Sequence, residues 1–141
     1  MSLVSDIPAA SPHAAATHFA FRLTVETDCA DVGASMRVGA TDFVLLHVVG
    51  SPQAYAHRHV PGALHLRHAD ITAERMAAWP EDALFVVYCA GPHCNGADQA
   101  ALKLAKLARP VKIMIGGVAG WADQGLPFAS GCEPGALDVT A

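Results

Sequence analysis

Strong positive charge is absent from this chain of 141 residues. It holds 9 lysine and arginine residues against 13 aspartate and glutamate residues, which gives a formal net charge of −4, and it has no run of basic side chains. Proteins that bind nucleic acid usually present a basic patch, so we expect no nucleic-acid partner. Long apolar runs are absent too. No segment approaches the roughly 18 uninterrupted apolar residues that a transmembrane helix requires, so we expect no membrane partner.

Cysteine is sparse, and its spacing argues against two familiar uses. Four cysteines do not make a disulfide framework in a chain of this length. Cys89 and Cys94 have four residues between them, and neither Cys29 nor Cys132 has a close partner, whereas zinc sites usually use tighter pairs. The N-terminus lacks the basic and apolar stretches of a secretory signal. We therefore expect a cytoplasmic protein with free thiols and with no metal ion or other cofactor.

Apolar sequence is what the chain has in quantity: 52% of its residues are hydrophobic, which suffices for a sizeable core. Short apolar runs alternate with segments of helical spacing. This alternation is typical of an α/β domain, in which helices cover both faces of a parallel sheet. We predict strands near 43–49, 64–66, 85–88 and 111–115, and helices near 13–23, 29–37, 53–58, 71–79 and 96–108, with a further short helix through Trp121.

The periodic pattern fades at both ends of the chain. Residues 1–11 resemble a loose leader, and no periodicity marks the segment after Phe128. No internal repeat or linker divides the part between them. We predict a flexible leader over 1–11, a single domain over 12–128 and a C-terminal tail over 129–141.

The most informative stretch surrounds Cys89. An apolar run, Phe85-Val86-Val87-Tyr88, ends at this cysteine, a loop of small residues follows, and a helical pattern begins at about Gly96. In a parallel sheet, ligands bind beyond the carboxyl ends of the strands. Free backbone N–H groups in the loop and the positive end of the helix dipole would both favour a thiolate there. The alternative is a buried, inert cysteine at a strand end.

Several separated motifs occur in the order and spacing of one known family. They are Leu45-Leu46-His47-Val48, Ser51-Pro52-Gln53-Ala54-Tyr55, His59-Val60-Pro61-Gly62-Ala63, Val86-Val87-Tyr88-Cys89, and Gly116-Gly117-Val118-Ala119-Gly120-Trp121 with Gly125-Leu126-Pro127 after it. Together they resemble a single-domain rhodanese-like (thiosulfate sulfurtransferase-like) protein over residues 24–128. The resemblance implies a five-stranded parallel sheet flanked by helices on both faces.

The resemblance also implies a chemistry for Cys89. In this family the cysteine takes a sulfane sulfur from a small donor as a persulfide and passes it to a thiol or to cyanide, and a protein acceptor is a further candidate. A persulfide is anionic, so a loop of inward N–H groups would stabilise it. The loop that would hold it comprises Ala90, Gly91, Pro92, His93, Cys94, Asn95 and Gly96.

The chain departs from the family pattern at three places. The family loop usually carries an arginine near its end, where this chain has Cys94 or Asn95, so an anionic donor such as thiosulfate loses a bidentate contact. The Asp-Val-Arg common after the first long strand is replaced by His47-Val48-Val49, which removes an ion pair. Cys94 is, in addition, a second thiol within the loop.

Other side chains could support the site. Arg58 and Arg67 lie in loops that the resemblance brings near Cys89 and could supply the missing cation. The alternative is that both are ordinary surface arginines. His47 takes the place of the family's aspartate. His93 is either an exposed loop residue or, when protonated, a group that raises the thiolate content of the loop.

These features leave three functional hypotheses. The first is a sulfurtransferase or persulfide carrier with Cys89 as the nucleophile. The second is a binding or regulatory module that has kept the fold and lost the activity, because the loop arginine is missing. The third is a dithiol redox element that uses Cys89 and Cys94.

Overall fold

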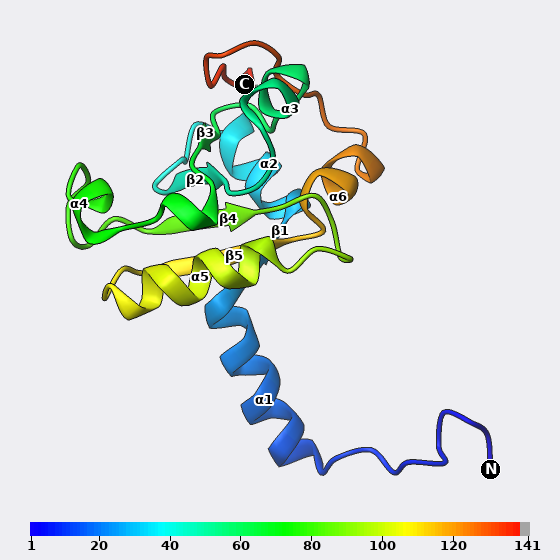
Figure 1. Ribbon diagram of the computed structural model, residues 1–141. Coiled ribbons are helices and arrows are strands. Elements are labelled where there is room, and N and C mark those ends of the chain that lie inside the picture. Colours follow the sequence, from blue (N-terminus) through cyan, green and yellow to red (C-terminus); the bar gives the residue numbers. More distant parts are fainter. Residues whose placement is uncertain (139–141) are drawn as a thin grey trace.

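A five-stranded parallel sheet forms the centre of the protein in a computed structural model that describes residues 1–138 (Figure 1). The strand order is β1-β5-β4-β2-β3, and every neighbouring pair runs parallel. The predicted α/β class and the five-stranded sheet are therefore confirmed. The strands are β1 (Glu26–Asp28), β2 (Val44–His47), β3 (Leu64–His65), β4 (Phe85–Tyr88) and β5 (Val111–Ile115).

Strand β4 is the buried centre of the sheet. All four of its residues are buried, as the uninterrupted apolar run predicts for a strand covered on both faces. Its register places Val87 between Leu46 of β2 and Ile113 of β5. Because side chains alternate along a strand, Phe85 and Val87 face one layer of helices, and Val86 and Tyr88 face the other.

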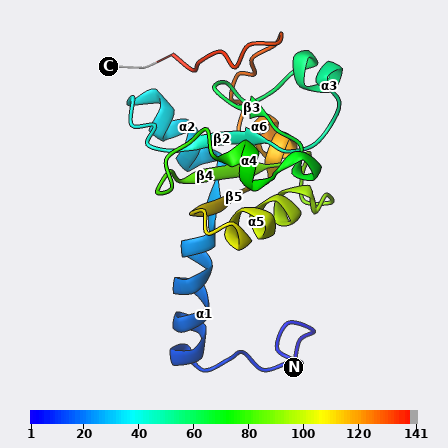
Figure 2. The same ribbon diagram turned by 60° about the vertical axis from the view of Figure 1, so that its left-hand side comes forward.

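Helices cover both faces of the sheet, as predicted (Figures 1 and 2). One core lies under α5 (Gly96–Lys106), the 3₁₀ turn η1 (His68–Asp70) and α4 (Ala73–Met76). The other lies under α2 (Cys29–Arg37) and α6 (Gly117–Asp123). The short helix α3 (Pro52–His57) follows β2 and begins at the N-cap Ser51. The carboxyl ends of the strands therefore open between two layers of helices.

Two elements differ from the sequence prediction. Strand β1 was not predicted, because its three residues, Glu-Thr-Asp, carry no apolar pattern and it pairs only at the sheet edge. The helix expected over 71–79 is shorter and spans only Ala73–Met76. Its start is fixed by Thr72, whose hydroxyl accepts a hydrogen bond from the Arg75 N–H. It ends at Met76, and the Trp79 N–H donates to the Met76 carbonyl in a turn that leads into Pro80.

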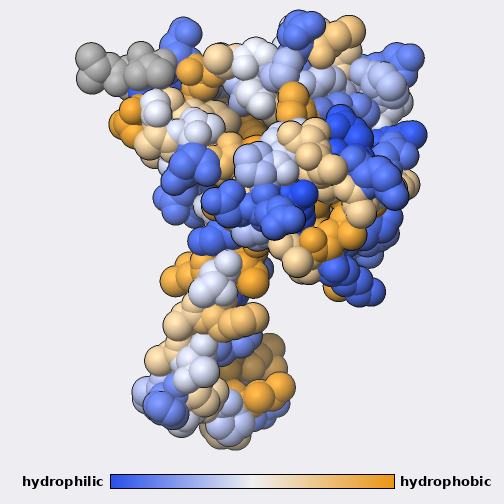
Figure 3. Space-filling model, turned by 90° about the vertical axis from the view of Figure 1, so that its left-hand side faces the viewer, coloured by the Kyte–Doolittle hydropathy of each residue, from blue (hydrophilic) through white to orange (hydrophobic). Residues whose placement is uncertain are grey.

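The first helix, α1 (Pro12–Val25), projects away from the sheet (Figure 1). None of its residues is buried, and its apolar side chains lie along the projecting part in Figure 3, with Phe21 67% and Leu23 70% exposed. It begins at the N-cap Ser11 followed by Pro12, a standard helix start. None of the helices in residues 1–138 is long and apolar enough to span a membrane.

The predicted tail, of which 139–141 lie outside the described residues, contacts the domain. Ala129 exchanges two backbone hydrogen bonds with His59, and Gly131 donates to the carbonyl of Ala56. Pro134 accepts hydrogen bonds from the Gly62 N–H and from His59 Nε2. Residues 129–134 thus lie alongside the turn between α3 and β3.

Candidate active site

Strand β4 delivers Cys89 to a loop that ends where α5 begins. The thiol is only 4% exposed and donates hydrogen bonds to the carbonyls of Cys94 (3.2 Å) and Gly91 (3.8 Å). Glycine is required at Gly96, because a Cβ there would overlap Val49 Cγ1. The loop therefore curls tightly around the sulfur between the sheet and the first turn of α5.

The start of α6 holds the other side of this loop. The N–H groups of Val118 and Ala119 donate to the carbonyls of Cys89 (3.0 Å) and Ala90 (2.9 Å). Gly117 makes this approach feasible: its φ is +57°, and a Cβ on it would overlap the Cys89 carbonyl. The Gly116-Gly117 pair of the sequence motif thus positions the cysteine.

The loop surrounds two sulfur atoms rather than one. The N–H of Gly96 donates to Cys94 Sγ at 3.4 Å and lowers the pKa of Cys94, and the Ala90 N–H acts in the same direction. Burial raises the pKa of Cys89, although the N–H groups of Ala97 and Gly91 oppose that rise. The two side chains also act on each other: Cys94 raises the pKa of Cys89, and Cys89 lowers the pKa of Cys94. The pKa values of the two thiols are therefore shifted apart, that of Cys94 downward and that of Cys89 upward.

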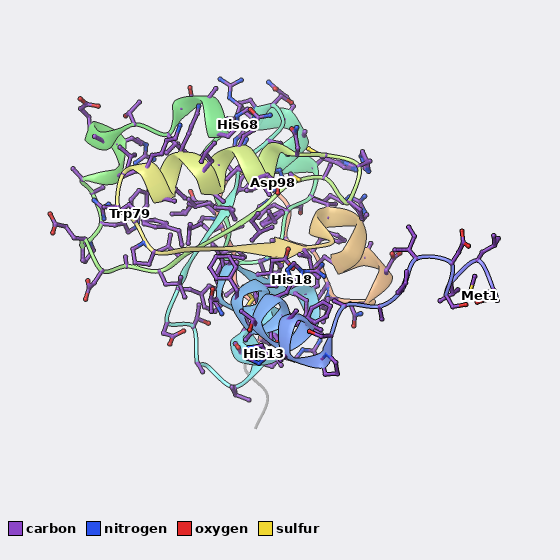
Figure 4. The ribbon with its side chains drawn as sticks, turned by 90° about the horizontal axis from the view of Figure 1, so that it is seen from below. Met1, His13, His18, His68, Trp79 and Asp98 are labelled. Carbon is purple, nitrogen blue, oxygen red and sulfur yellow. The ribbon has the colours of Figure 1, made fainter. Side chains whose placement is uncertain are left out.

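Cys89 and Cys94 line a cavity of about 560 Å³ bounded by the end of α1, β1, α2, α5 and β5. Its charged walls are predominantly acidic: Glu26 and Asp28 stand on one side, and Asp98 stands on the first turn of α5, on the side that faces β5 (Figure 4). Among the described residues, Arg22 is the one cation that lines it, and its Nε is bonded to Glu26 at 2.8 Å. The cavity is therefore poorly suited to an anion.

A third cysteine lines the same cavity and is inert. Cys29 lies at the start of α2, where its thiol donates to the carbonyls of Ile115 (3.5 Å) and Gly117 (3.6 Å). Burial, with the Asp28 carboxylate beside it, raises the pKa of Cys29 to about 11. A thiol with this pKa is protonated at neutral pH and is a weak nucleophile.

Several residues singled out in the sequence lie elsewhere. His47, Arg58 and His93 line a separate cavity of about 480 Å³, on the other side of the loop, where Ala90 also faces. Arg67 pairs with Asp70 at 3.3 Å. Neither arginine lines the Cys89 cavity, whereas Gly91 and Pro92 do. Asn95 accepts a hydrogen bond from the Gln99 amide and lies outside it.

His47 belongs to a buried hydrogen-bonded network with Tyr88, the residue before Cys89. The Val60 N–H donates to the Tyr88 hydroxyl at 3.0 Å, and that hydroxyl lies 2.7 Å from His47 Nδ1, to which it donates when the neutral ring carries its proton on Nε2. Burial lowers the pKa of His47 to about 4, which keeps the ring neutral. A neutral histidine–tyrosine pair thus stands where the family pattern has a charged brace. Alternation along β4 could have indicated Tyr88, since it places that side chain opposite Cys89.

A sequence profile of the Rhodanese-like domain matches residues 37–124. The chain belongs to the rhodanese-like domain family. Its structure is similar to that of the BH2092 protein from Bacillus halodurans, with a TM-score of 0.81 and 30% identity over 86% of this chain and 88% of that one. The fold also matches thiosulfate sulfurtransferase from Pseudomonas aeruginosa, with a TM-score of 0.64 and 20% identity, covering 86% of this chain and 23% of that one.

One curated relative extends well beyond a rhodanese-like domain of this size. The HTH-type transcriptional regulator Rv0324 of Mycobacterium tuberculosis is 32% identical over 83 residues, which are 59% of this chain and 36% of the regulator. The match therefore spans about a third of that protein's length. The rhodanese-like family places this chain in the sulfurtransferase superfamily, as the sequence motifs indicate.

Proposed function

We propose that this rhodanese-like domain is a sulfur carrier that accepts a sulfane sulfur on Cys89 as a persulfide and passes it to a thiol. The observation that carries the proposal is the placement of Cys89 at the carboxyl end of the central strand, in a cavity that the first turn of α5 also lines. The free N–H groups at the start of that helix would stabilise the negative charge of a persulfide. A reducing cytoplasm is the compartment that would keep these thiols available.

The loading step takes place at Cys89. The Cys89 thiol gives up its proton, which ends on the thiol that the donor releases. The Cys89 sulfur attacks the outer sulfur of a persulfide donor, R–S–SH, and the donor leaves as the thiol R–SH. With thiosulfate as the donor, the leaving group would be sulfite. Both reactions are ordinary nucleophilic displacements at sulfur.

The charge of the cavity favours one class of donor. Asp98, Asp28 and Glu26 repel a dianion, and Arg22 is already paired with Glu26. The donors that fit are neutral or zwitterionic persulfides, and thiosulfate would load slowly. The acceptor would be a small thiol, or a thiol on a protein, that likewise carries no net negative charge.

Intact mass spectrometry tests the proposal. The reduced protein is incubated without oxygen with cysteine persulfide or with thiosulfate, and then desalted. We expect a product heavier by one sulfur in the Cys94→Ser variant, with cysteine persulfide loading faster than thiosulfate. The adduct must be absent from the Cys89→Ser/Cys94→Ser variant and present in a Cys132→Ser/Cys94→Ser control. No adduct with either donor, in protein whose fold is intact, would overturn the proposal.

A binding or regulatory module is the second candidate. It is supported by the absence of a loop arginine between Cys89 and Gly96 and by the similarity to a part of a transcriptional regulator. Steady transfer of sulfur from a persulfide to a thiol acceptor, lost in Cys89→Ser, would exclude it.

A further inference from the structure

We propose that Cys94 is a resolving thiol, which attacks the Cys89 persulfide, expels hydrosulfide and leaves a Cys89–Cys94 disulfide. This inference rests on the proposed function, because it begins from the persulfide on Cys89. It adds an outcome that a simple carrier lacks, since the protein itself would reduce a sulfane sulfur to sulfide once per loading. The Cys89–Cys94 pair would then need a reducing thiol before it could accept sulfur again.

The loop places the two sulfurs together. Cys89 and Cys94 line the same cavity, and the Cys89 thiol donates to the Cys94 carbonyl at 3.2 Å. The point where a Cβ on Gly96 would stand lies 3.5 Å from Cys89 Cβ and 3.5 Å from Cys94 Sγ, so both side chains border one small space. A sulfur added to Cys89 would enter the cavity that Cys94 lines.

Cys94 has the environment of an attacking group. Its Sγ accepts the Gly96 N–H at the start of the eleven-residue helix α5, where the helix dipole also favours an anion. These contacts lower the pKa of Cys94 and so favour its thiolate, which is the form that reacts. Cys29 lines the same cavity but donates its proton to two carbonyls, and its pKa is raised, so it does not compete.

The step balances without an added oxidant. The Cys94 thiolate forms a bond to Cys89 Sγ, the bond between Sγ and the outer sulfur breaks, and the outer sulfur leaves with the electron pair as hydrosulfide. The two cysteine sulfurs are oxidised, and the sulfane sulfur is reduced. Attack on the outer sulfur would instead expel the Cys89 thiolate, a poor leaving group because burial raises its pKa. A low-molecular-weight thiol would later reduce the disulfide.

The experiment uses the full chain in the wild-type, Cys94→Ser and Cys132→Ser forms. Each reduced protein receives cysteine persulfide without oxygen, is desalted at intervals, and is analysed by intact mass, by peptide mapping and by a sulfide assay. For the wild type we expect a brief gain of one sulfur, then a product two hydrogens lighter than the starting protein, with one sulfide released per chain. Mapping should join Cys89 to Cys94. The control Cys132→Ser, which changes an exposed cysteine outside the cavity, should behave like the wild type.

The Cys94→Ser variant separates this inference from the proposed function. We expect it to keep the added sulfur and to lose the disulfide and the protein-dependent sulfide release. If the wild type also keeps a stable persulfide, the resolving role is overturned and the carrier function stands. If neither protein gains sulfur, the carrier function fails first. A disulfide that forms in the wild type without any donor would assign the pair to general thiol oxidation and would also overturn the inference.

Discussion

Acid should destabilise this protein through His47, a buried residue of β2 that pairs with Tyr88 of β4. The folded state holds His47 neutral, because burial lowers its pKa from 6.5 to about 4, with nearby His65 and His59 acting in the same direction. The unfolded chain would bind a proton at His47 as the pH falls through 6.5, whereas the folded chain would not do so until about pH 4. The stability contributed by the neutral ring is therefore complete above pH 6.5 and is lost between these two values.

The size of the effect follows from the two pKa values. A difference between 6.5 and about 4 corresponds to about 3 kcal/mol over the whole range. Between pH 6.5 and pH 5 the expected loss is about 2 kcal/mol, which is large beside the 5–15 kcal/mol stability typical of a domain. The loss would act on Tyr88, whose hydroxyl lies 2.7 Å from His47 Nδ1, and so on the segment that positions Cys89.

Urea unfolding at a series of pH values measures this effect in the wild type and in His47→Asn. The asparagine Oδ1 can stand near the place of Nδ1 and accept the Tyr88 proton, but it does not titrate. We expect the variant to be less stable at about pH 7.5 and the gap to narrow by about 2 kcal/mol at about pH 5. Contributions from groups that do not interact with His47 are the same in both proteins and cancel in the difference. A gap that stays constant with pH would refute the neutral, buried state of His47.

Three further changes test how the site is held. Tyr88→Phe leaves the buried Val60 N–H and His47 Nδ1 without a partner and should cost about 1–3 kcal/mol in urea unfolding, with faster alkylation of Cys89. Gly117→Ala combines a positive φ with an overlap at the Cys89 carbonyl, so it should destabilise the protein and displace the loop. Its control is Gly131→Ala, where φ is also positive but the space is open, so this change should cost only the backbone strain of about 1–2 kcal/mol. Asp98→Asn removes a carboxylate that acts on Cys94, so the rate of labelling by an anionic methanethiosulfonate relative to a cationic one should rise roughly two- to fivefold, whereas an unchanged ratio would contradict the acidic character of the cavity.

The sheet could be predicted where burial leaves a pattern in the sequence. Strand β4 is covered on both faces, so its apolar run Phe85–Tyr88 predicted it at the observed bounds. Helix α2 was predicted at its observed bounds, Cys29–Arg37, because Asp28 is a typical N-cap residue. In the structure the Asp28 carboxylate accepts a hydrogen bond from the Asp31 N–H. Strand β1 could not be predicted this way, since tertiary pairing with β5 alone makes its polar residues extended.

The sequence predicts the position of Cys89 in the fold but not the residues that surround it. The strand–cysteine–loop–helix order places Cys89, because that order is local in sequence. The walls of its cavity are not local: Glu26 and Asp28 come from β1, which pairs with β5 across the sheet. For the same reason Arg58, expected near Cys89, could not be placed on the far side of the loop until the fold was known.

The departures from the family pattern act in one direction. Where the family loop has an arginine, this chain has Cys94 or Asn95, and where the family has a charged brace, it has the neutral pair His47 and Tyr88. The carboxylates of Glu26, Asp28 and Asp98 complete a cavity in which a dianion has no free cation to meet. A second thiol whose pKa is lowered is a poor substitute for an anion clamp and a good partner for sulfur exchange. These replacements are why we propose persulfides, and not thiosulfate, as the sulfur donors of this site.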